Sequence, residues 1–571
     1  MSNKPFGEPR YSSVAMVGVC AFVTLMLSDW PQVWWFASDP DLSNLMRLLT
    51  SPVHLDDDVM ISLRPGNIFS DTGIASFNRT DISQPSTSYL TPYIFAILAY
   101  SLPENLAVIV YAGLGFCAVL GTFGNIFFLA KSWLNAALVI LALTLTSTNL
   151  IHALNGWDHL FQAFFLTLAV VIAQKENGSR RRLLSLSLLL VLGVAFRPDG
   201  LLIAISIIVY AIISSSVKGR ILHWVALPFV SALVAILMLN LYQFGTLMTT
   251  TTRLKFGGAS SMDYVAKYII ENAVLSFSSI TLCIIFFVIY LIYRKSVFGN
   301  SQLPIIIGCF VTSLIAAVNS DVFFGGRMFW TSSCIMVCAL ALVSPALFEY
   351  KKQGTKHGLV LSETYKLVGY KSKFVKFWKI VGMFFLIVLV TSASITALRE
   401  KLRSSSLEKE ALSNTAQQYL ISQWIEQNMS PNDGSIGFFY LGVAYHLPTF
   451  EIADFLGKAD EMIARSRVKW GAPGHNKWDI TKTLEKWNPQ AIISASNSDF
   501  SITAVKVKAA TELVRKDGFG WFSDLVFSEK VRMEYTYCYL VSKAGKRDQW
   551  GFFIRRDLVD RYSDGLLCVK D

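Results

Sequence analysis

Residues 183–217 read LLSLSLLLVLGVAFRPDGLLIAISIIVYAIISSSV. Two apolar runs, 183–196 and 200–217, stand on either side of Arg197-Pro198-Asp199 and carry no charged residue of their own. Similar runs recur along most of the chain, and a helix of about 20 apolar residues crosses a hydrocarbon core about 30 Å thick. The pattern predicts a polytopic α-helical membrane protein.

The composition agrees with a membrane protein. Only 16% of the 571 residues are charged and 53% are hydrophobic, with a mean hydropathy of +0.45, whereas soluble proteins carry about 25% charged residues. A soluble enzyme, a fibrous protein and a disordered scaffold are therefore excluded. The net charge of +11 does not indicate nucleic acid as a partner, because much of the excess lies in short loops beside apolar runs, as the positive-inside rule describes.

About twelve apolar segments, or 11 to 13 spans, are expected; they lie at 11–28, 89–103, 106–130, 134–151, 159–174, 183–196, 200–217, 221–243, 274–293, 303–318, 328–348 and 380–397. The strongest orientation signal is Lys351–Lys379, which holds eight lysines and a single acid and is expected to be cytoplasmic. Counting spans from this block and from the N-terminus gives a conflict between residues 89 and 151. One segment there is expected to be re-entrant, half-spanning or divided into two short helices.

Two parts are expected. Residues 1–397 form the multi-span part, with a long outer loop at 30–88, and residues 398–571 contain no membrane-length apolar run and read as an extracytoplasmic α/β domain. Expected elements of this domain are a helix at 407–428, strands at 435–440, 449–453 and 490–495, and a hairpin of 533–541 with 549–554. Cys538 and Cys568 form either one disulfide or two unpaired thiols, and both alternatives stay open.

The outer loop contains the densest acidic feature, Asp56-Asp57-Asp58. Adjacent carboxylates can act as a general base or hold a divalent cation such as Mg²⁺, Mn²⁺ or Ca²⁺, and Asp57 with Asp58 is the candidate pair. The alternative is a solvated turn.

Other charged side chains stand at the predicted outer ends of different helices: Asp158, Arg197, Asp199, Arg253, Lys255, Asp321 and Arg327. Any one of them alone could be a loop residue among lipid headgroups, but together they are expected to converge on one polar cavity. Arg and Lys bind phosphate well. Carboxylates and cations at one membrane face indicate group transfer from a lipid-linked phosphate donor.

The outer loop also resembles a known family. Asp57-Asp58-Val-Met-Ile-Ser-Leu-Arg64, then Gly73-Ile-Ala-Ser-Phe-Asn78 and Ser88-Tyr-Leu90, are similar to the first outer loop of GT-C glycosyltransferases. The closest resemblance is to mycobacterial-type terminal β-arabinofuranosyltransferases and their bacterial relatives. Further resemblances follow in order at Arg197-Pro-Asp-Gly200, Tyr242–Lys255, Asn319–Arg327, Asp454–Arg465 and Pro473–Trp478. Departures from the family pattern at Met60, Arg79–Asp81 and Thr250-Thr251 concern the donor sugar and the acceptor more than the fold.

The resemblance implies an inverting glycosyltransferase of a bacterial inner membrane that takes a sugar, with arabinofuranose as the first choice, from a polyprenyl-phosphate donor. The acceptor would be an envelope glycan or a surface protein. In this interpretation Asp57 is the base and Asp58 supports it or holds a cation. Arg197, Lys255 and Arg327 are candidates for the donor phosphate. The candidates for sugar or acceptor contacts are Arg64, Asp158, Asp199, Asp321, His475 and Lys477.

Two alternatives to an enzyme remain. A lipid or lipid-linked-sugar transporter would also need intramembrane charges, but here the charges gather at one face and no repeat symmetry is visible. An assembly or sensing protein would need fewer spans than this chain has.

Overall fold

The computed structural model describes residues 57–129, 156–174, 178–256, 302–318, 329–349, 421–439, 441–469, 476–493, 520–541, 547–562 and 566–568. The predicted segments at 11–28, 134–151, 274–293 and 380–397 lie outside these residues, as does the boundary expected between residues 397 and 398.

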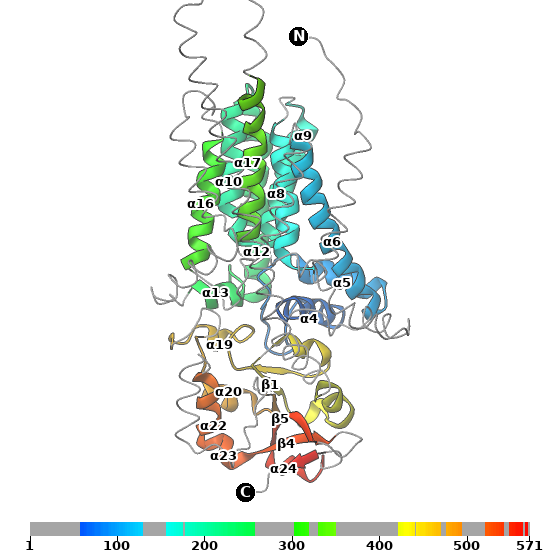
Figure 1. The fold of residues 1–571 in the computed structure, drawn as a ribbon. Helices are drawn as coiled ribbons and strands as arrows, with labels where there is room; N and C mark the ends of the chain where they lie inside the picture. The colour runs from blue at the N-terminus through cyan, green and yellow to red at the C-terminus, as the bar shows by residue number, and fades with distance from the viewer. Residues whose placement is uncertain are drawn as a thin grey trace, which may run out of the picture.

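Apolar helices form a bundle at one end of the molecule (Figure 1). They are α6 (Glu104–Leu129), α8 (Asp158–Gln174), α9 (Arg180–Phe196), α10 (Leu201–Ser214), α12 (Leu227–Phe244), α16 (Leu303–Val318) and α17 (Trp330–Glu349). α11 (Lys218–Ile221) and the π-helical turn η5 (Leu222–Ala226) lead into α12. Each helix coincides with a predicted apolar segment to within a few residues.

All of these apolar segments are predicted from the sequence to cross a membrane. Among the described helices, Leu106–Leu129 and Lys218–Phe244 are long and apolar enough to cross a membrane. Five shorter apolar helices of 10–17 residues accompany them. The helical part of the prediction is therefore confirmed for the described residues, while the polytopic arrangement and the count of about twelve spans stay predictions.

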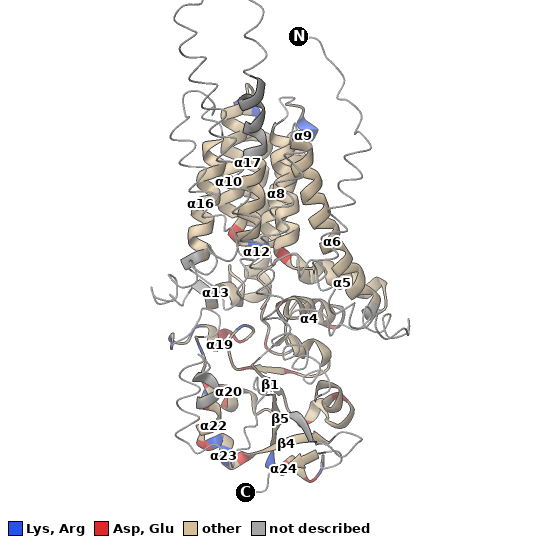
Figure 2. Cartoon of the chain, viewed as in Figure 1, with Lys and Arg blue, Asp and Glu red and all other residues tan. Residues whose placement is uncertain are grey.

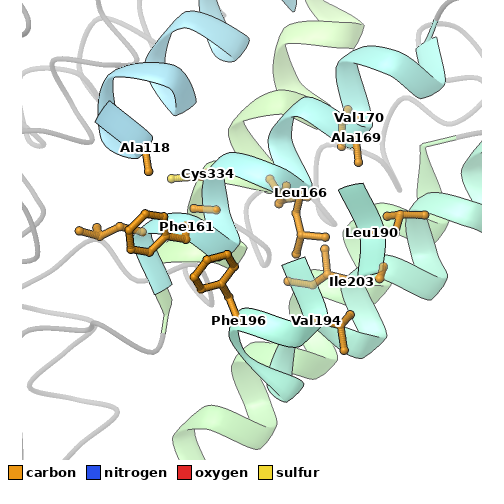
Figure 3. Close-up of a cluster of buried hydrophobic side chains, with 14 of the residues drawn as sticks. Ala118, Phe161, Leu166, Ala169, Val170, Leu190, Val194, Phe196, Ile203 and Cys334 are labelled. Carbon is orange, nitrogen blue, oxygen red and sulfur yellow. The ribbon is translucent and has the colours of Figure 1, made fainter. Parts of the chain in front are cut away.

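Aromatic and aliphatic side chains fill the bundle, as Figure 3 shows for the contact of α8 with α9 and α10. Phe161 of α8 stacks on Phe196 of α9 with ring centroids 4.7 Å apart. Leu166, Leu190 and Ile203 are fully buried around this stack. The bundle thus has a close-packed interior of its own.

Charge separates the two ends of the bundle. Lys and Arg mark the end where α9 begins (Figure 2), since α9 opens with Arg180-Arg181-Arg182, and α11, which follows the end of α10, contains Lys218 and Arg220. α8 begins with Asp158 at the other end, beside the C-terminal part. Which end faces the cytoplasm stays a prediction of the positive-inside rule.

The helix α5 (Thr91–Ser101) has only 11 residues. At 1.5 Å per residue it is about 16 Å long, which is about half the hydrocarbon thickness. α5 packs on α4 (Asp57–Thr72), a helix that lies between the bundle and the C-terminal part (Figure 1). The described helix of segment 89–103 is therefore too short to span. That one segment between residues 89 and 151 does not cross stays a prediction, since residues 130–155 lie outside the described part of the chain.

The C-terminal part is built on one mixed six-stranded sheet in the order β2-β1-β3-β5-β4-β6. The strands are β1 (Ile436–Phe438), β2 (Ile452–Asp454), β3 (Ala491–Ile493), β4 (Tyr535–Val541), β5 (Arg547–Arg555) and β6 (Leu566–Cys568). β1, β2 and β3 run parallel, whereas β5, β4 and β6 pair antiparallel. The three expected strands and the hairpin are confirmed, with shifts of a few residues. Of the expected helix at 407–428, residues 421–428 are described and are helical.

Alternating side chains give the sheet two buried faces. Ile492, Phe553 and Tyr537 belong to one core cluster, and their neighbours Ile493 and Phe552 belong to the other. The C-terminal part also contains short helices: η8 (Pro431–Asp433), η9 (Leu441–His446), α19 (Glu461–Ala464), α20 (Ile480–Trp487), α22 (Gly520–Phe527), α23 (Glu529–Glu534) and α24 (Arg556–Val559). Of the two alternatives for Cys538 and Cys568, the structure has the disulfide, which joins β4 to β6.

The outer loop is part of the C-terminal core rather than a free connector. Ile61 and Phe77 are buried in the same cluster as Ile436 and Phe438 of β1. The side chain of Asn78 is hydrogen-bonded to the backbone of β2. Its amide Nδ2 donates to Ile452 O at 2.8 Å, and its Oδ1 accepts from Ile452 N at 2.9 Å. The loop and the sheet therefore form one structural unit.

Candidate active site

The acidic pair belongs to α4. Asp57 and Asp58 are the first two residues of this helix that the structure describes. The side chain of Asp57 lies outside the described atoms. Asp58 is 29% exposed, and its Oδ1 lies 3.5 Å from Nζ of Lys458. The fold thus brings a cation from the C-terminal part to a carboxylate of α4.

Asp158 is held at the start of α8 by a tight approach to α6. Gly156, with φ +67°, makes the turn before it, and a Cβ on Gly115 of α6 would lie only 2.5 Å from the Gly156 Cα. Asp158 Oδ1 accepts a hydrogen bond from Thr91 Oγ1 at 2.6 Å, and the hydroxyl of Thr87 also bonds its side chain. Two hydroxyls therefore fix one carboxylate at the polar end of the bundle.

Arg197 is positioned by the end of α9. Pro198 ends the helix, and Arg197 takes an extended conformation with φ −153°. Its guanidinium, 11% exposed, pairs with Asp199 at 2.8 Å. Gln162 of α8 donates to both Arg197 O and Asp199 Oδ1 at 2.9 Å and accepts from Thr331 of α17 at 2.6 Å. Residues of α8, η4 (Pro198–Gly200) and α17 therefore hold this ion pair in a defined place.

These groups converge. Asp158 lies within electrostatic range of both Arg197 and Asp58, and Asp58 contacts Lys458. They come from four chain segments, including the loop after β2, and meet where the apolar bundle adjoins the C-terminal part. Because charges in such a place are costly unless they have partners or a ligand, the cluster is the candidate site. A described pocket around Ile172, Arg182 and Val217 lies where α8, α9 and α10 meet at the opposite end of the bundle.

Two expected ligand contacts are corrected by the structure. Arg64 is fully buried, and its guanidinium donates to the backbone carbonyls of Phe77, Ala444, Leu447 and Phe450. The ammonium of Lys477 is buried and donates to Ala464 O at 2.7 Å. Both side chains hold backbone in place, which corrects their expected role as sugar or acceptor contacts.

The other expected site residues are placed only in part. Lys255 lies on α13 (Thr250–Phe256), with its side chain outside the described atoms; Asp321, Arg327 and His475 lie outside the described residues. On α13, Arg253 pairs with Glu461 of α19, and Thr251 Oγ1 donates to Lys458 O at 3.3 Å. Arg253 thus joins two parts of the molecule, and α13 touches the loop that carries Lys458.

Lys458, Thr87 and Thr91 had no role expected from the sequence. Lys458 stands in an otherwise apolar stretch, Phe455-Leu-Gly-Lys-Ala459, and an isolated cation there is a signal that can be recognised. The two threonines gave no such signal, because they become significant only when the chain brings them to Asp158.

No family model matches the chain, and no curated protein matches it. Two solved structures are similar to it, each with a TM-score of 0.47. One is the archaeal oligosaccharyltransferase AglB from Archaeoglobus fulgidus, in complex with an inhibitory peptide and a dolichol-phosphate, at 9% identity over 94% of this chain and 74% of that chain. The other is ArnT from Cupriavidus metallidurans bound to undecaprenyl phosphate, at 12% identity over 95% of this chain and 97% of that chain. Both similarities are distant and concern the overall course of the chain.

Proposed function

We propose that this protein is an integral-membrane glycosyltransferase that moves a sugar from a polyprenyl-phosphate donor to an extracytoplasmic glycan or protein, with inversion at the anomeric carbon. The observation that carries the proposal is the convergence of Asp58, Asp158, Arg197 and Lys458 at the polar end of an apolar bundle. A lipid-linked donor keeps its chain among apolar helices while its phosphate and sugar meet polar groups. The cluster lies where these two surroundings meet, between the apolar bundle and the C-terminal part.

The reaction needs a base and cations. The acceptor hydroxyl loses its proton to a loop carboxylate, for which Asp57 is the candidate, and its oxygen attacks the anomeric carbon. The bond from that carbon to the phosphate oxygen breaks, and polyprenyl phosphate leaves with the electron pair. Cations stabilise the charge that develops on the phosphate, and Arg197 and Lys255 remain candidates for this role. Asp158 and Asp199 remain candidates for contacts to sugar hydroxyls.

The test is transfer of labelled sugar from synthetic polyprenyl-phosphate arabinofuranose to a cell-envelope extract, with purified wild type and Asp57→Asn. Loss of a general base is expected to lower the rate at least about 100-fold. Asp71→Asn is the matched control, because Asp71 lies on the same helix α4 but pairs with Arg79 instead; its rate should stay near that of wild type.

Each other outcome is informative. Equal rates for wild type and Asp57→Asn would remove Asp57 as the base. Absence of transfer from arabinofuranose, mannose, galacturonate and aminoarabinose donors alike would contradict the proposed reaction. NMR of the product's anomeric configuration tests inversion separately.

A further inference from the structure

Cationic side chains gather at the end of the bundle that lies away from the candidate active site (Figure 2). We call it the basic end; its residues are Arg180, Arg181 and Arg182 of α9 with Lys218 and Arg220 of α11. All of them except Arg182 are exposed. The stretches 178–196 and 201–226, which contain these residues, have no Asp or Glu. The basic end is therefore a concentrated positive charge that no carboxylate of these two stretches offsets.

The fold brings the two basic segments together. A Cβ on Gly178, two residues before Arg180, would lie 2.8 Å from Cγ2 of Val217, the residue before Lys218. The guanidinium of Arg180 lies over the ring of Trp224 in η5, 4.1 Å from the ring centroid, where the face of an indole attracts a cation. The start of α9 and the turns that follow α10 therefore form one surface, and Trp224 helps to hold Arg180 on it.

The pocket at this end of the bundle lies beside the cations. Gly178 and Val217, which join the two basic segments, both line it. Arg182 lines it too, and its Nη2 donates to Ile172 O of α8 at 3.0 Å. The surface of the molecule is therefore hollowed where its positive charge is concentrated, so a bound group can be contacted from more than one segment.

The helix that continues from these cations is apolar and exposed. The stretch Lys218–Phe244 is long and apolar enough to cross a membrane, and only 17% of its apolar window is buried inside the molecule. Leu227, Val230 and Val234 of α12 are exposed and lie on one face, because they are three and four residues apart. Exposed apolar surface of this kind is typical of contact with lipid. The basic end thus begins where an apolar, lipid-type surface ends.

We propose that the basic end binds the phosphate of an anionic phospholipid, such as phosphatidylglycerol, whose acyl chains lie against α12. This inference rests on the membrane location in the proposed function and not on sugar transfer. An anionic phospholipid offers both features that the surface requires, a negative charge at the headgroup and apolar chains directly next to it. Basic pockets between membrane helices bind acidic headgroups in this way. A soluble phosphate would use the cations and leave the apolar face of α12 uncovered.

The test measures the Kd of phosphatidylglycerol with a fluorescent label on one acyl chain, by anisotropy, for the purified full chain in detergent. Phosphatidylcholine with the same chains and label is the comparison, because its headgroup has no net charge. Wild type is expected to bind phosphatidylglycerol at least about 10-fold more tightly. Arg180→Gln/Arg220→Gln should remove most of this preference without changing the Kd of phosphatidylcholine. An equal Kd of the two lipids for wild type would overturn the proposal.

Arg465→Gln/Lys482→Gln is the matched control. It removes the same charge from the C-terminal part, where these side chains are 63% and 59% exposed, and should leave the preference for phosphatidylglycerol unchanged. If both double variants lower the preference alike, the effect comes from net charge and the proposed site is wrong.

A second variant keeps the test decisive if Arg180→Gln/Arg220→Gln does not fold. Arg181 and Lys218 are exposed, one on each basic segment, and Arg181→Gln/Lys218→Gln should also weaken binding of phosphatidylglycerol. Arg180→Lys/Arg220→Lys keeps both charges and should retain most of the preference. An unchanged preference in Arg181→Gln/Lys218→Gln, or its complete loss in the lysine variant, would contradict binding by the charge of this end.

Competition separates a lipid from a soluble phosphate. Unlabelled phosphatidylglycerol should displace the labelled lipid, whereas glycerol 3-phosphate at the same concentration should not. Displacement by both alike would assign a soluble phosphate to the basic end and overturn the proposal. A wild type that transfers sugar but does not prefer phosphatidylglycerol would contradict this inference alone. A wild type that prefers phosphatidylglycerol but transfers no sugar would contradict the proposed function alone.

Discussion

Arg64 illustrates how one buried side chain can hold distant backbone segments together. Its guanidinium has no exposed surface and donates to four carbonyl groups, three of which are at least 380 positions away in sequence. A lysine has a single nitrogen and cannot reach all four acceptors. Each buried carbonyl left without a donor costs about 1–3 kcal/mol.

We therefore expect Arg64→Lys to lower the free energy of unfolding by about 3 kcal/mol, seen as a lower thermal midpoint of the full chain in detergent. Arg465→Lys is the control, because the Arg465 side chain is 63% exposed and pairs only at the surface with Glu461; its effect should stay within about 0.5 kcal/mol. Equal effects of the two variants would show that the four carbonyl contacts do not hold the fold.

The buried carboxyl of Asp454 should make the free energy of unfolding depend on pH. Burial raises the pKa of its carboxyl to about 6 from an ordinary 3.8, against two backbone N–H bonds that lower it. Between pH 4 and 6 the folded state then keeps a proton that the unfolded state has released. Stability from this group is full below pH 4 and is lost as the pH rises through 6, by at most about 3 kcal/mol.

The check compares wild type with Asp454→Asn, which does not titrate, at pH 4, 5, 6 and 7. The free energy of unfolding of wild type should fall relative to that of the variant as the pH rises. A wild type that instead gains stability relative to the variant would show that the N–H groups of Leu456 and Ala459 keep the carboxylate ionised.

At the scale of elements, the strands and helices could largely be predicted from local patterns. The runs at 183–196 and 200–217 became α9 and α10, and Arg197 lies between them because Pro198 cannot continue the helix. Segment 89–103 was harder, because its hydropathy matches a span while Pro103 and the start of α6 at Glu104 limit α5 to 11 residues. Composition indicates apolar surroundings, but helix length decides whether a segment crosses.

The disulfide between β4 and β6 gives an element-scale prediction. It closes a loop with a sequence separation of 30 residues, so its removal should cost about 3 kcal/mol through the added freedom of the unfolded chain. A reducing agent should lower the thermal midpoint of wild type and have no such effect on the Cys538→Ala/Cys568→Ala variant. Alkylation of both thiols in unreduced, denatured protein would contradict the assignment.

At the scale of the whole molecule, the sequence could not show which residues meet. Asp57, Asp58, Asp158 and Arg197 were identified as candidates because charges at helix ends are locally visible. The pairing of Asp58 with Lys458 spans 400 positions, and no local pattern contains it. For the same reason Arg64 was mistaken for a ligand contact, since only the docked C-terminal part provides its partners.

Asn78 and Ile452 are hydrogen-bonded across 374 positions of sequence. A ribosome that adds about 5–20 residues per second needs roughly 20–75 s between synthesising the first partner and the second. During that interval the apolar helices can already insert, while the loop after Asp57 lacks the strand that completes it. The candidate site is therefore completed late in biosynthesis, and a chain that stops before residue 452 would have the apolar helices without the strand that holds the outer loop.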